Sequence, residues 1–114
     1  MFLGADVSYI NEVEDSGGAY YDGRHSVDPF ALLAAHGANL ARARLWHTPD
    51  WTAYSTLDDV KRTFRRAKNA GMASMLDFHY SDTWADPAKQ VVPAAWAHLS
   101  DTASLAEAVY DYTV

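Results

Sequence analysis

Residues 76–87 read LDFHYSDTWADP and divide into two parts of different character. The first part continues an apolar stretch that starts after Gly71, which predicts a β-strand. The second part is rich in Ser, Asp, Thr and Pro, which end strands and form loops. A buried strand that ends in Asp, His, Tyr and Trp is typical of the rim of an active site in a parallel β/α fold.

The residues on either side repeat this alternation of strand and helix. Strands are expected at residues 2–7, at residues 39–46 and directly after Gly71. Asp28-Pro29 and Thr56 are start signals for two helices, because Asp and Thr cap free backbone N–H groups and Pro suits the first helical position. A third helix is expected at Thr102–Thr113, or slightly later if Ser104 and Glu107 form a capping box.

Gly37 and Gly71 occupy equivalent places, each ending a helix just before a strand, and they lie 34 residues apart. Right-handed crossovers make the three strands parallel. The expected fold class is α/β, a (β/α)8 TIM barrel of which this chain carries about the first three β/α units. A full barrel needs roughly 200–250 residues, so residues 1–114 are expected to be the N-terminal part of a single domain, truncated before the fourth strand.

Composition excludes several classes of function. A formal net charge of −6 argues against binding to nucleic acid or to anionic membrane surfaces. The absence of Cys excludes disulfides, thiol catalysis and thiolate metal sites. No apolar run is long enough to cross a membrane, and residues 1–10 show no signal peptide.

Three side chains of the second strand, Arg42, Arg44 and Trp46, share one face because side chains alternate. Two Arg residues that point into a barrel are unfavourable unless carboxylates pair with them. Asp77, in the third strand, is a candidate partner, and Asp6 can either bind a substrate hydroxyl or brace an Arg. The alternative is an Arg–Asp network that only holds the sheet together.

His79 and Trp84 follow the third strand and are the strongest candidates for contact with a substrate. His79 can donate to a substrate hydroxyl or orient a carboxylate. The indole face of Trp84 fits the C–H face of a sugar ring, with loop packing as the alternative. Further aromatic residues are expected to serve packing: Trp51, Trp96, Tyr54 and Tyr80.

Metal binding is a weaker reading of the same region. The five His residues show no HxH or HExxH spacing, although Asp77, His79 and Asp82 can be pictured around a cation. Two sets of charged residues are expected to face solvent, one in a loop and one on a helix: Glu12, Glu14 and Asp15, and Lys61, Arg62, Arg65, Arg66 and Lys68.

Seven segments carry a resemblance to a known family, and they cover nearly the whole chain in family order. They are GADVSY (4–9), HGAN (36–39), RARLW (42–46) with Pro49, AKNAGM (67–72), DFHYSDTWADP (77–87), PAAW (93–96) and AVYDYT (108–113). With them the chain resembles glycoside hydrolase family 53, the arabinogalactan endo-β-1,4-galactanases. His47 departs from the family pattern, because an apolar residue is expected at this position.

The resemblance implies a (β/α)8 barrel that cuts internal β-1,4-galactosidic bonds in the galactan side chains of pectin. Two Glu residues, at the ends of the fourth and seventh strands, act as general acid/base and nucleophile in a retaining mechanism. Both are expected beyond Val114, so no catalytic residue is assigned in this chain. The 114-residue chain is therefore predicted to be inactive alone.

The resemblance also assigns roles within the chain. Arg44 corresponds to the barrel Arg that supports the nucleophile, His79 lines the cleft, and Trp84 shapes the sugar-binding region. Further support residues are Asp6, Arg42, Trp46 and Asp77. The implied partner is a galactan polysaccharide and the implied location is extracellular. No cofactor or metal is expected in this chain, although a calcium site in later loops of the full enzyme is compatible with the family.

Two alternatives to this enzyme reading stay open. One is a non-catalytic remnant that binds galactan weakly or assembles with another fragment. The other is a metal-dependent barrel hydrolase that uses Asp77 and His79.

Overall fold

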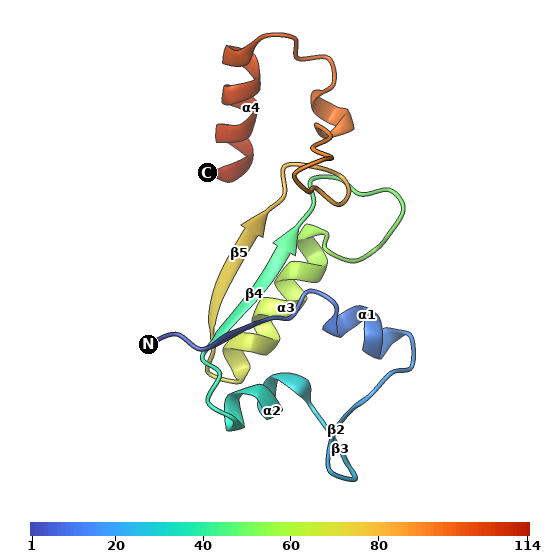
Figure 1. Ribbon diagram of the computed structural model, residues 1–114, viewed down its shortest axis with the longest axis vertical. Helices are drawn as coiled ribbons and strands as arrows, with labels where there is room; N and C mark the ends of the chain where they lie inside the picture. The colour runs from blue at the N-terminus through green and yellow to red at the C-terminus, as the bar shows by residue number, and fades with distance from the viewer.

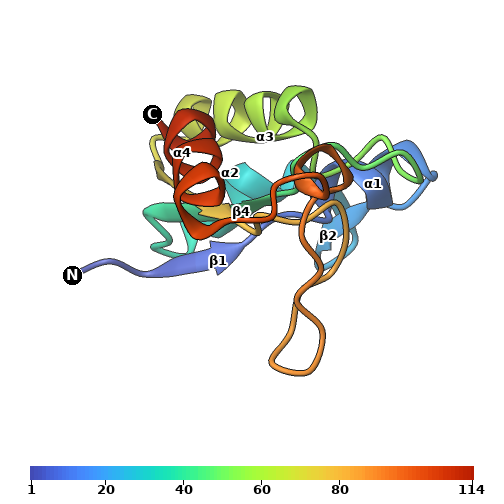
Figure 2. The ribbon, with the colours of Figure 1, turned by 90° about the horizontal axis from the view of Figure 1, so that it is seen from above.

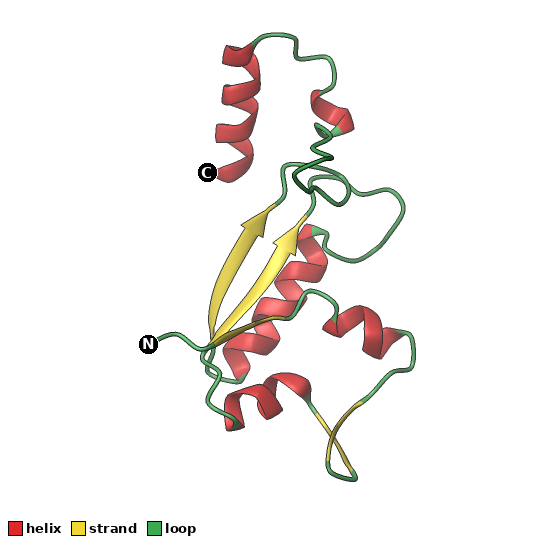
Figure 3. Cartoon of the chain, viewed as in Figure 1, coloured by secondary structure: helices red, strands yellow, loops and turns green.

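A three-stranded parallel sheet organises the protein. The computed structural model describes residues 1–114, with strands β1 (Gly4–Asp6), β4 (Leu40–Leu45) and β5 (Ala73–Phe78) in the order β1-β4-β5 (Figure 1, Figure 3). The register pairs Asp6 with Arg42, and Arg44 with Asp77. The three expected parallel strands are therefore confirmed, and their carboxyl ends lie at one edge.

The three expected helices are present with their predicted caps. Helices α2 (Pro29–Ala35) and α3 (Leu57–Asn69) begin after Asp28 and Thr56, whose side chains accept from backbone N–H groups. Helix α4 (Thr102–Thr113) is capped by Asp101, which accepts from the Ser104 N–H at 2.9 Å. The alternative start at a Ser104 capping box is therefore wrong. None of these helices is both long and apolar enough to cross a lipid bilayer.

The segment between β1 and α2, expected to be a polar loop, contains three short elements. They are helix α1 (Ile10–Asp15) and a hairpin of β2 (Tyr20–Asp22) and β3 (His25–Val27). Helix α1 has six residues and no side-chain cap, so neither periodicity nor a cap marks it in the sequence. Gly23 turns the hairpin at φ +59°, a conformation that favours glycine.

One face of β4 packs against helix α3. Ala41 and Ala43 are fully buried beneath α3, because small side chains let a helix approach the sheet closely. Figure 2 shows α3 along one face of the sheet, while the orange segment after β5 projects from the other side. The main core lies between the sheet and the helices: Val7, Ile10, Phe30, Ala41, Ala67 and Met72.

Helix α4 stands beyond the carboxyl ends of β4 and β5 (Figure 1). A 3₁₀ turn, η1 (Ala94–Trp96), precedes it. No residue of α4 is buried, but Leu105, Val109 and Tyr112, expected on its inner side, are partly covered. Tyr112 donates to the Trp46 carbonyl at 3.3 Å, which ties α4 to the end of β4.

Val114 directly follows α4 and is the last residue described. Its backbone N–H donates to the Tyr110 carbonyl at 3.1 Å, which extends the helical hydrogen bonding to this position. The main sheet has three strands up to Val114, so the carboxyl ends of a fourth and a seventh strand are not among residues 1–114. The location of both catalytic Glu residues beyond Val114 stays a prediction.

Charged residues expected to be solvated instead join α1 to α3. Arg66 contacts Glu14 at 2.5 Å and Asp28 at 2.8 Å, and Arg62 contacts Asp15 at 2.6 Å. The solvent-facing prediction is wrong for Glu14 and Arg66, because it treated the acidic segment as a loop with no fixed partner. Asp15 and Arg62 pair with each other, but their side chains stay 37% and 43% exposed.

Asn11 is the buried centre of this junction and is 1% exposed. Its amide nitrogen donates to Asp59 Oδ1 at 2.7 Å and to Thr63 Oγ1 at 2.8 Å, and its oxygen accepts from Arg66 at 2.8 Å. Every polar atom of this side chain is thus used to hold α1 on α3.

Substituting Asn11→Ala should lower the free energy of unfolding by about 2 kcal/mol, because it leaves buried partners without a hydrogen bond. Urea denaturation of the complete protein that contains this chain measures the effect. Glu107→Ala, at an exposed position on α4, is the matched control and should leave stability unchanged. Equal stability of the two variants would contradict the role given to Asn11.

Candidate functional site

Arg42 joins all three strands at their carboxyl edge. Its guanidinium pairs with Asp6 of β1 through Nη1 and with Asp77 of β5 through Nη2. Asp77 was expected as an Arg partner, and the pairing of Asp6 matches one of its two expected roles. The three side chains keep between 28% and 41% exposure, so the pairs lie at the surface of the open face.

Asp6 is held in its ionised form by its neighbours. Burial on its own would raise the pKa of Asp6, but hydrogen bonds from Ser8 and the Arg42 guanidinium outweigh it and hold the pKa below the ordinary 3.8. One of these bonds is the backbone N–H of Ser8 to Oδ1, at 3.0 Å. Asp6 therefore stays ionised through mildly acidic conditions.

His79 continues the network from Asp77 to Trp46. The indole Nε1 of Trp46 lies 3.1 Å from His79 Nδ1, and His79 Nε2 lies 3.1 Å from Asp77 Oδ2. An indole N–H only donates, so Nδ1 accepts and the ring proton sits on Nε2, where it donates to Asp77. Both ring nitrogens are engaged. Of the two roles expected for His79, the geometry fits orienting a carboxylate and leaves no free N–H for a substrate.

Arg44 lies beside this network in a different environment. It is 4% exposed, and its guanidinium carbon lies 4.3 Å from the ring centres of Tyr9 and Trp84 and 4.9 Å from that of Trp46. No carboxylate of the chain pairs with it, and its buried Nε has no hydrogen-bond partner. Aromatic faces compensate a buried cation only in part. The site is therefore suited to receive an anionic group next to Arg44.

Two Trp residues, Trp46 and Trp84, contact this cation, and Trp51 packs against Trp46. Trp46 is 2% exposed, whereas Trp84 is 44% exposed and Trp51 is 56% exposed. The rings of Trp84 and Trp51 lie 5.5 Å and 5.0 Å from that of Trp46. Trp51 packs against Trp46, as predicted, although more than half of its surface stays exposed, and Trp96, at 8% exposure, also serves packing.

Asp82 holds together the loops that follow β4 and β5, a role that sequence reasoning missed. Its carboxylate accepts from the backbone N–H groups of Thr48 and Ala94, each at 2.8 Å. Its carbonyl oxygen accepts from the Trp51 indole at 3.0 Å. The position of Asp82 at the start of a loop was the available signal, but its partners are 12 to 34 residues away.

The metal-binding reading required Asp77, His79 and Asp82 to converge. Asp77 and His79 do meet, but the carboxylate of Asp82 is turned to the backbone of the neighbouring loops. The chain contains no group of three or more His, Cys, Asp or Glu side chains that is arranged to hold a metal ion. The geometry of these residues therefore does not fit that reading.

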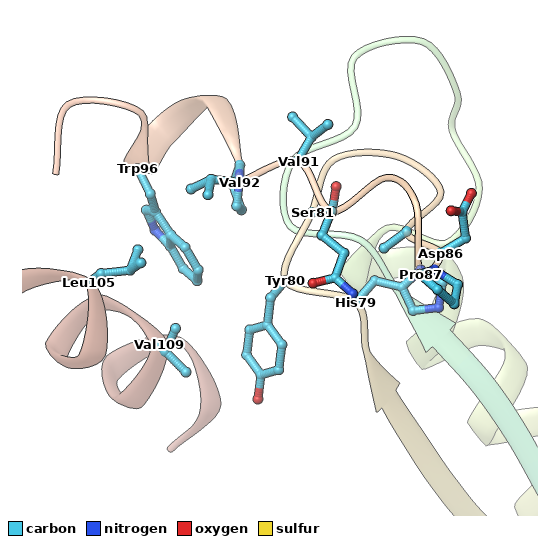
Figure 4. Close-up of a pocket in the computed structure, with 13 residues that line it drawn as sticks. His79, Tyr80, Ser81, Asp86, Pro87, Val91, Val92, Trp96, Leu105 and Val109 are labelled. Atoms are coloured by element: carbon cyan, nitrogen blue, oxygen red, sulfur yellow. The ribbon is translucent and has the colours of Figure 1, made fainter. Parts of the chain in front are cut away.

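A pocket of about 560 Å³ lies between the loop after β5 and α4 (Figure 4). Trp96 and Val92 face Leu105 and Val109 across it, and His79 and Asp86 lie at its far side. Nearby, the ring of His47 packs against Tyr112 and Trp96 at 4.5 and 4.8 Å. The pocket lining is mostly apolar, so the polar chemistry of the chain lies on the Arg42 and Arg44 side.

Substituting Asp6→Asn should lower stability at neutral pH by removing a carboxylate that is held ionised. The lowered pKa of Asp6 contributes stability that is fully present above 3.8 and is lost as the pH falls toward the folded-state value. The stability difference between wild type and variant should therefore shrink below pH 4. Denaturant melts of the complete protein between pH 7 and pH 2.5 test this, and a constant difference would contradict it.

The chain matches one known protein family along nearly its whole length. The sequence model of Glycosyl hydrolase family 53 matches residues 2–114. The chain is 60% identical over 113 residues to the arabinogalactan endo-beta-1,4-galactanase of Cellvibrio japonicus, covering 99% of this chain and 30% of that protein. It is 43% identical to the endo-beta-1,4-galactanase of Bacillus subtilis, covering 96% of this chain and 27% of that protein.

Solved structures agree with the sequence matches. A fungal beta-1,4-galactanase superposes with a TM-score of 0.92 at 39% identity, covering 99% of this chain and 33% of that one. The GH53 catalytic domain of Ignisphaera aggregans gives a TM-score of 0.88 at 37% identity, with 98% and 33% coverage. The expected TIM-barrel fold is confirmed, and the chain spans about a third of the length of these relatives.

Proposed function

This chain belongs to glycosyl hydrolase family 53, and we propose that the protein containing it is an endo-β-1,4-galactanase. Its substrate is the β-1,4-galactan or arabinogalactan side chains of pectin, which it cuts internally with retention of configuration. Residues 1–114 form the N-terminal part of its single (β/α)8 catalytic domain. The enzyme acts outside the cell, because a polysaccharide of this size must be shortened before uptake.

The observation that carries this proposal is the unpaired, buried guanidinium of Arg44. A retaining glycosidase needs a carboxylate nucleophile, about 5 Å from a second carboxyl group that acts as acid and base. A carboxylate placed beside Arg44 gains a charged hydrogen-bond donor that the aromatic cage of Tyr9, Trp46 and Trp84 holds in position. A neighbouring cation also keeps that carboxylate ionised and ready to attack.

The other site residues take supporting roles in this scheme. Arg42, Asp6 and Asp77 fix the carboxyl ends of the strands relative to one another. His79 accepts a hydrogen bond from the Trp46 indole and so fixes this ring, which forms one wall of the Arg44 cage. The exposed indole of Trp84 supplies a stacking surface for a galactose ring next to the cation.

The chain's own carboxyl groups do not supply the catalytic pair. Asp6 and Asp77 are both paired with Arg42, and Asp82 is engaged by backbone N–H groups. The three Glu side chains lie on helices, and none of them pairs with the Arg44 guanidinium: Glu12 and Glu14 on α1 and Glu107 on α4. In this proposal both catalytic Glu residues therefore lie beyond Val114.

The second candidate function is galactan binding without hydrolysis. Two observations favour it: no carboxylate of this chain pairs with Arg44, and the exposed indoles suit sugar rings. Activity separates the two, since a binding remnant retains galactan but releases no product.

The complete protein should release galacto-oligosaccharides from β-1,4-galactan, and ¹H NMR during the first turnovers should show the β-anomer of the product. The 114-residue chain alone should release none. Hydrolysis by the isolated chain would contradict the placement of both catalytic carboxylates beyond Val114. Initial formation of the α-anomer would contradict retention.

Replacing Arg44→Met should lower kcat on galactan about 100-fold, by analogy with the loss of one preorganised charge-stabilising donor. The acidic limb of the pH–activity profile should also move to higher pH, because the nucleophile loses the neighbouring cation that keeps it ionised. Arg24→Met, at an exposed hairpin position, is the control and should change neither quantity. A loss of activity with an unchanged pH profile would assign Arg44 a merely structural role.

A further inference from the structure

We propose that Trp51 is an additional sugar-binding platform that recognises a galactose unit remote from the bond being cut. This inference rests on the proposed galactanase function and extends it. It gives the exposed part of the β4–α3 loop a role in recognising long galactan chains. The platform consists of Trp51 with Asp50, the residue before it in the chain.

The exposure of Trp51 is not explained by a missing neighbouring strand. It follows β4, the middle strand of the three, so the loops after β1 and β5 on either side are both described. Trp51 remains 56% exposed between them. This open indole lies at the edge of the sheet where a parallel β/α fold places its ligands.

The indole is also held in a defined position. Its Nε1 donates to the Asp82 carbonyl at 3.0 Å, and its ring packs against the buried Trp46 at 5.0 Å with a 48° tilt. Asp82 itself is anchored by two backbone N–H groups. A ring fixed before binding loses little conformational freedom when a sugar stacks on it, which favours affinity.

The residue before Trp51 in the chain carries a polar group suited to sugar hydroxyls. Asp50 is exposed, and its carboxylate makes no hydrogen bond or ion pair within the chain. Carboxylate oxygens accept hydrogen bonds from hydroxyl groups. An exposed indole and an unengaged acceptor on adjacent residues suit a galactose unit, which has a C–H face and a hydroxyl rim.

Trp51 lies farther from the reacting centre than Trp84. Both rings contact Trp46, but only Trp84 also contacts Arg44, at 4.3 Å. The two exposed indoles form no ring pair with each other. A galactan chain bound over Arg44 and Trp84 thus reaches Trp51 only through further sugar units, so the platform acts on long substrates.

The test is the dependence of kcat/KM on substrate length in the complete protein. For Trp51→Ala, KM for polymeric galactan should rise about tenfold, the size expected for one lost aromatic contact, with kcat unchanged. The kcat/KM for the shortest galacto-oligosaccharide that is cut should stay within about twofold of wild type. Trp51→Phe should recover most of the affinity for the polymer.

Tyr21→Ala is the matched control, since Tyr21 is 61% exposed on the β2–β3 hairpin and should have no effect. An equal loss on short and long substrates would mean that Trp51 only supports the loop, and no loss on either would mean that it binds nothing. Both results overturn the inference while the galactanase function stands. If the unaltered protein does not cut galactan, the proposed function itself fails.

A measurement on the unaltered protein covers the case in which Trp51→Ala does not fold. Oxidation of indole rings, mapped by mass spectrometry, should mark Trp51 and Trp84 because they are exposed. Saturating galacto-oligosaccharide of polymer-like length should protect both rings, and the shortest cut substrate should protect Trp84 alone. Continued oxidation of Trp51 under the long ligand would overturn the inference.

Discussion

The pairing of Arg42 with Asp6 and Asp77 is the interaction from which the rest of the carboxyl edge is built. One guanidinium in the middle strand bridges carboxylates on both neighbouring strands. Asp77 then orients His79, His79 accepts from Trp46, and Trp46 forms part of the cage around Arg44. The position of the Arg44 cation thus depends on a chain of contacts that begins at Arg42.

Arg42 and Arg44 lie on the same face of β4, but only Arg42 is paired with carboxylates. Arg42 is paired on both sides and partly exposed, so it fixes the three strands relative to one another. Arg44 is buried among aromatic rings without a carboxylate, which is costly unless an anion arrives. Beyond them, the loops held by Asp82 place Trp84 and Trp51 as two open surfaces at the same edge.

Much of this arrangement is foreseeable from particular residues. Alternation along β4 puts Arg42, Arg44 and Trp46 on one face. Asp28 and Thr56 predict the starts of the helices that they cap. Helix α1 was not foreseeable, because six residues give no clear period and no capping side chain marks its start. Once α1 is missed, its ion pairs with α3 are missed too, and Arg66 is wrongly assigned to solvent.

Local sequence was therefore sufficient for the strands, for the main helices and for the residue types that gather at the carboxyl edge. These depend on side-chain alternation, caps and glycine turns, which act over a few residues. Four features were decided only in the folded chain: the choice of Arg42 over Arg44 as the partner of both carboxylates, the engaged state of both His79 nitrogens, the isolation of Arg44 and the exposure of Trp51. They arise from contacts between residues about 30 or more positions apart, whose distances no local pattern encodes.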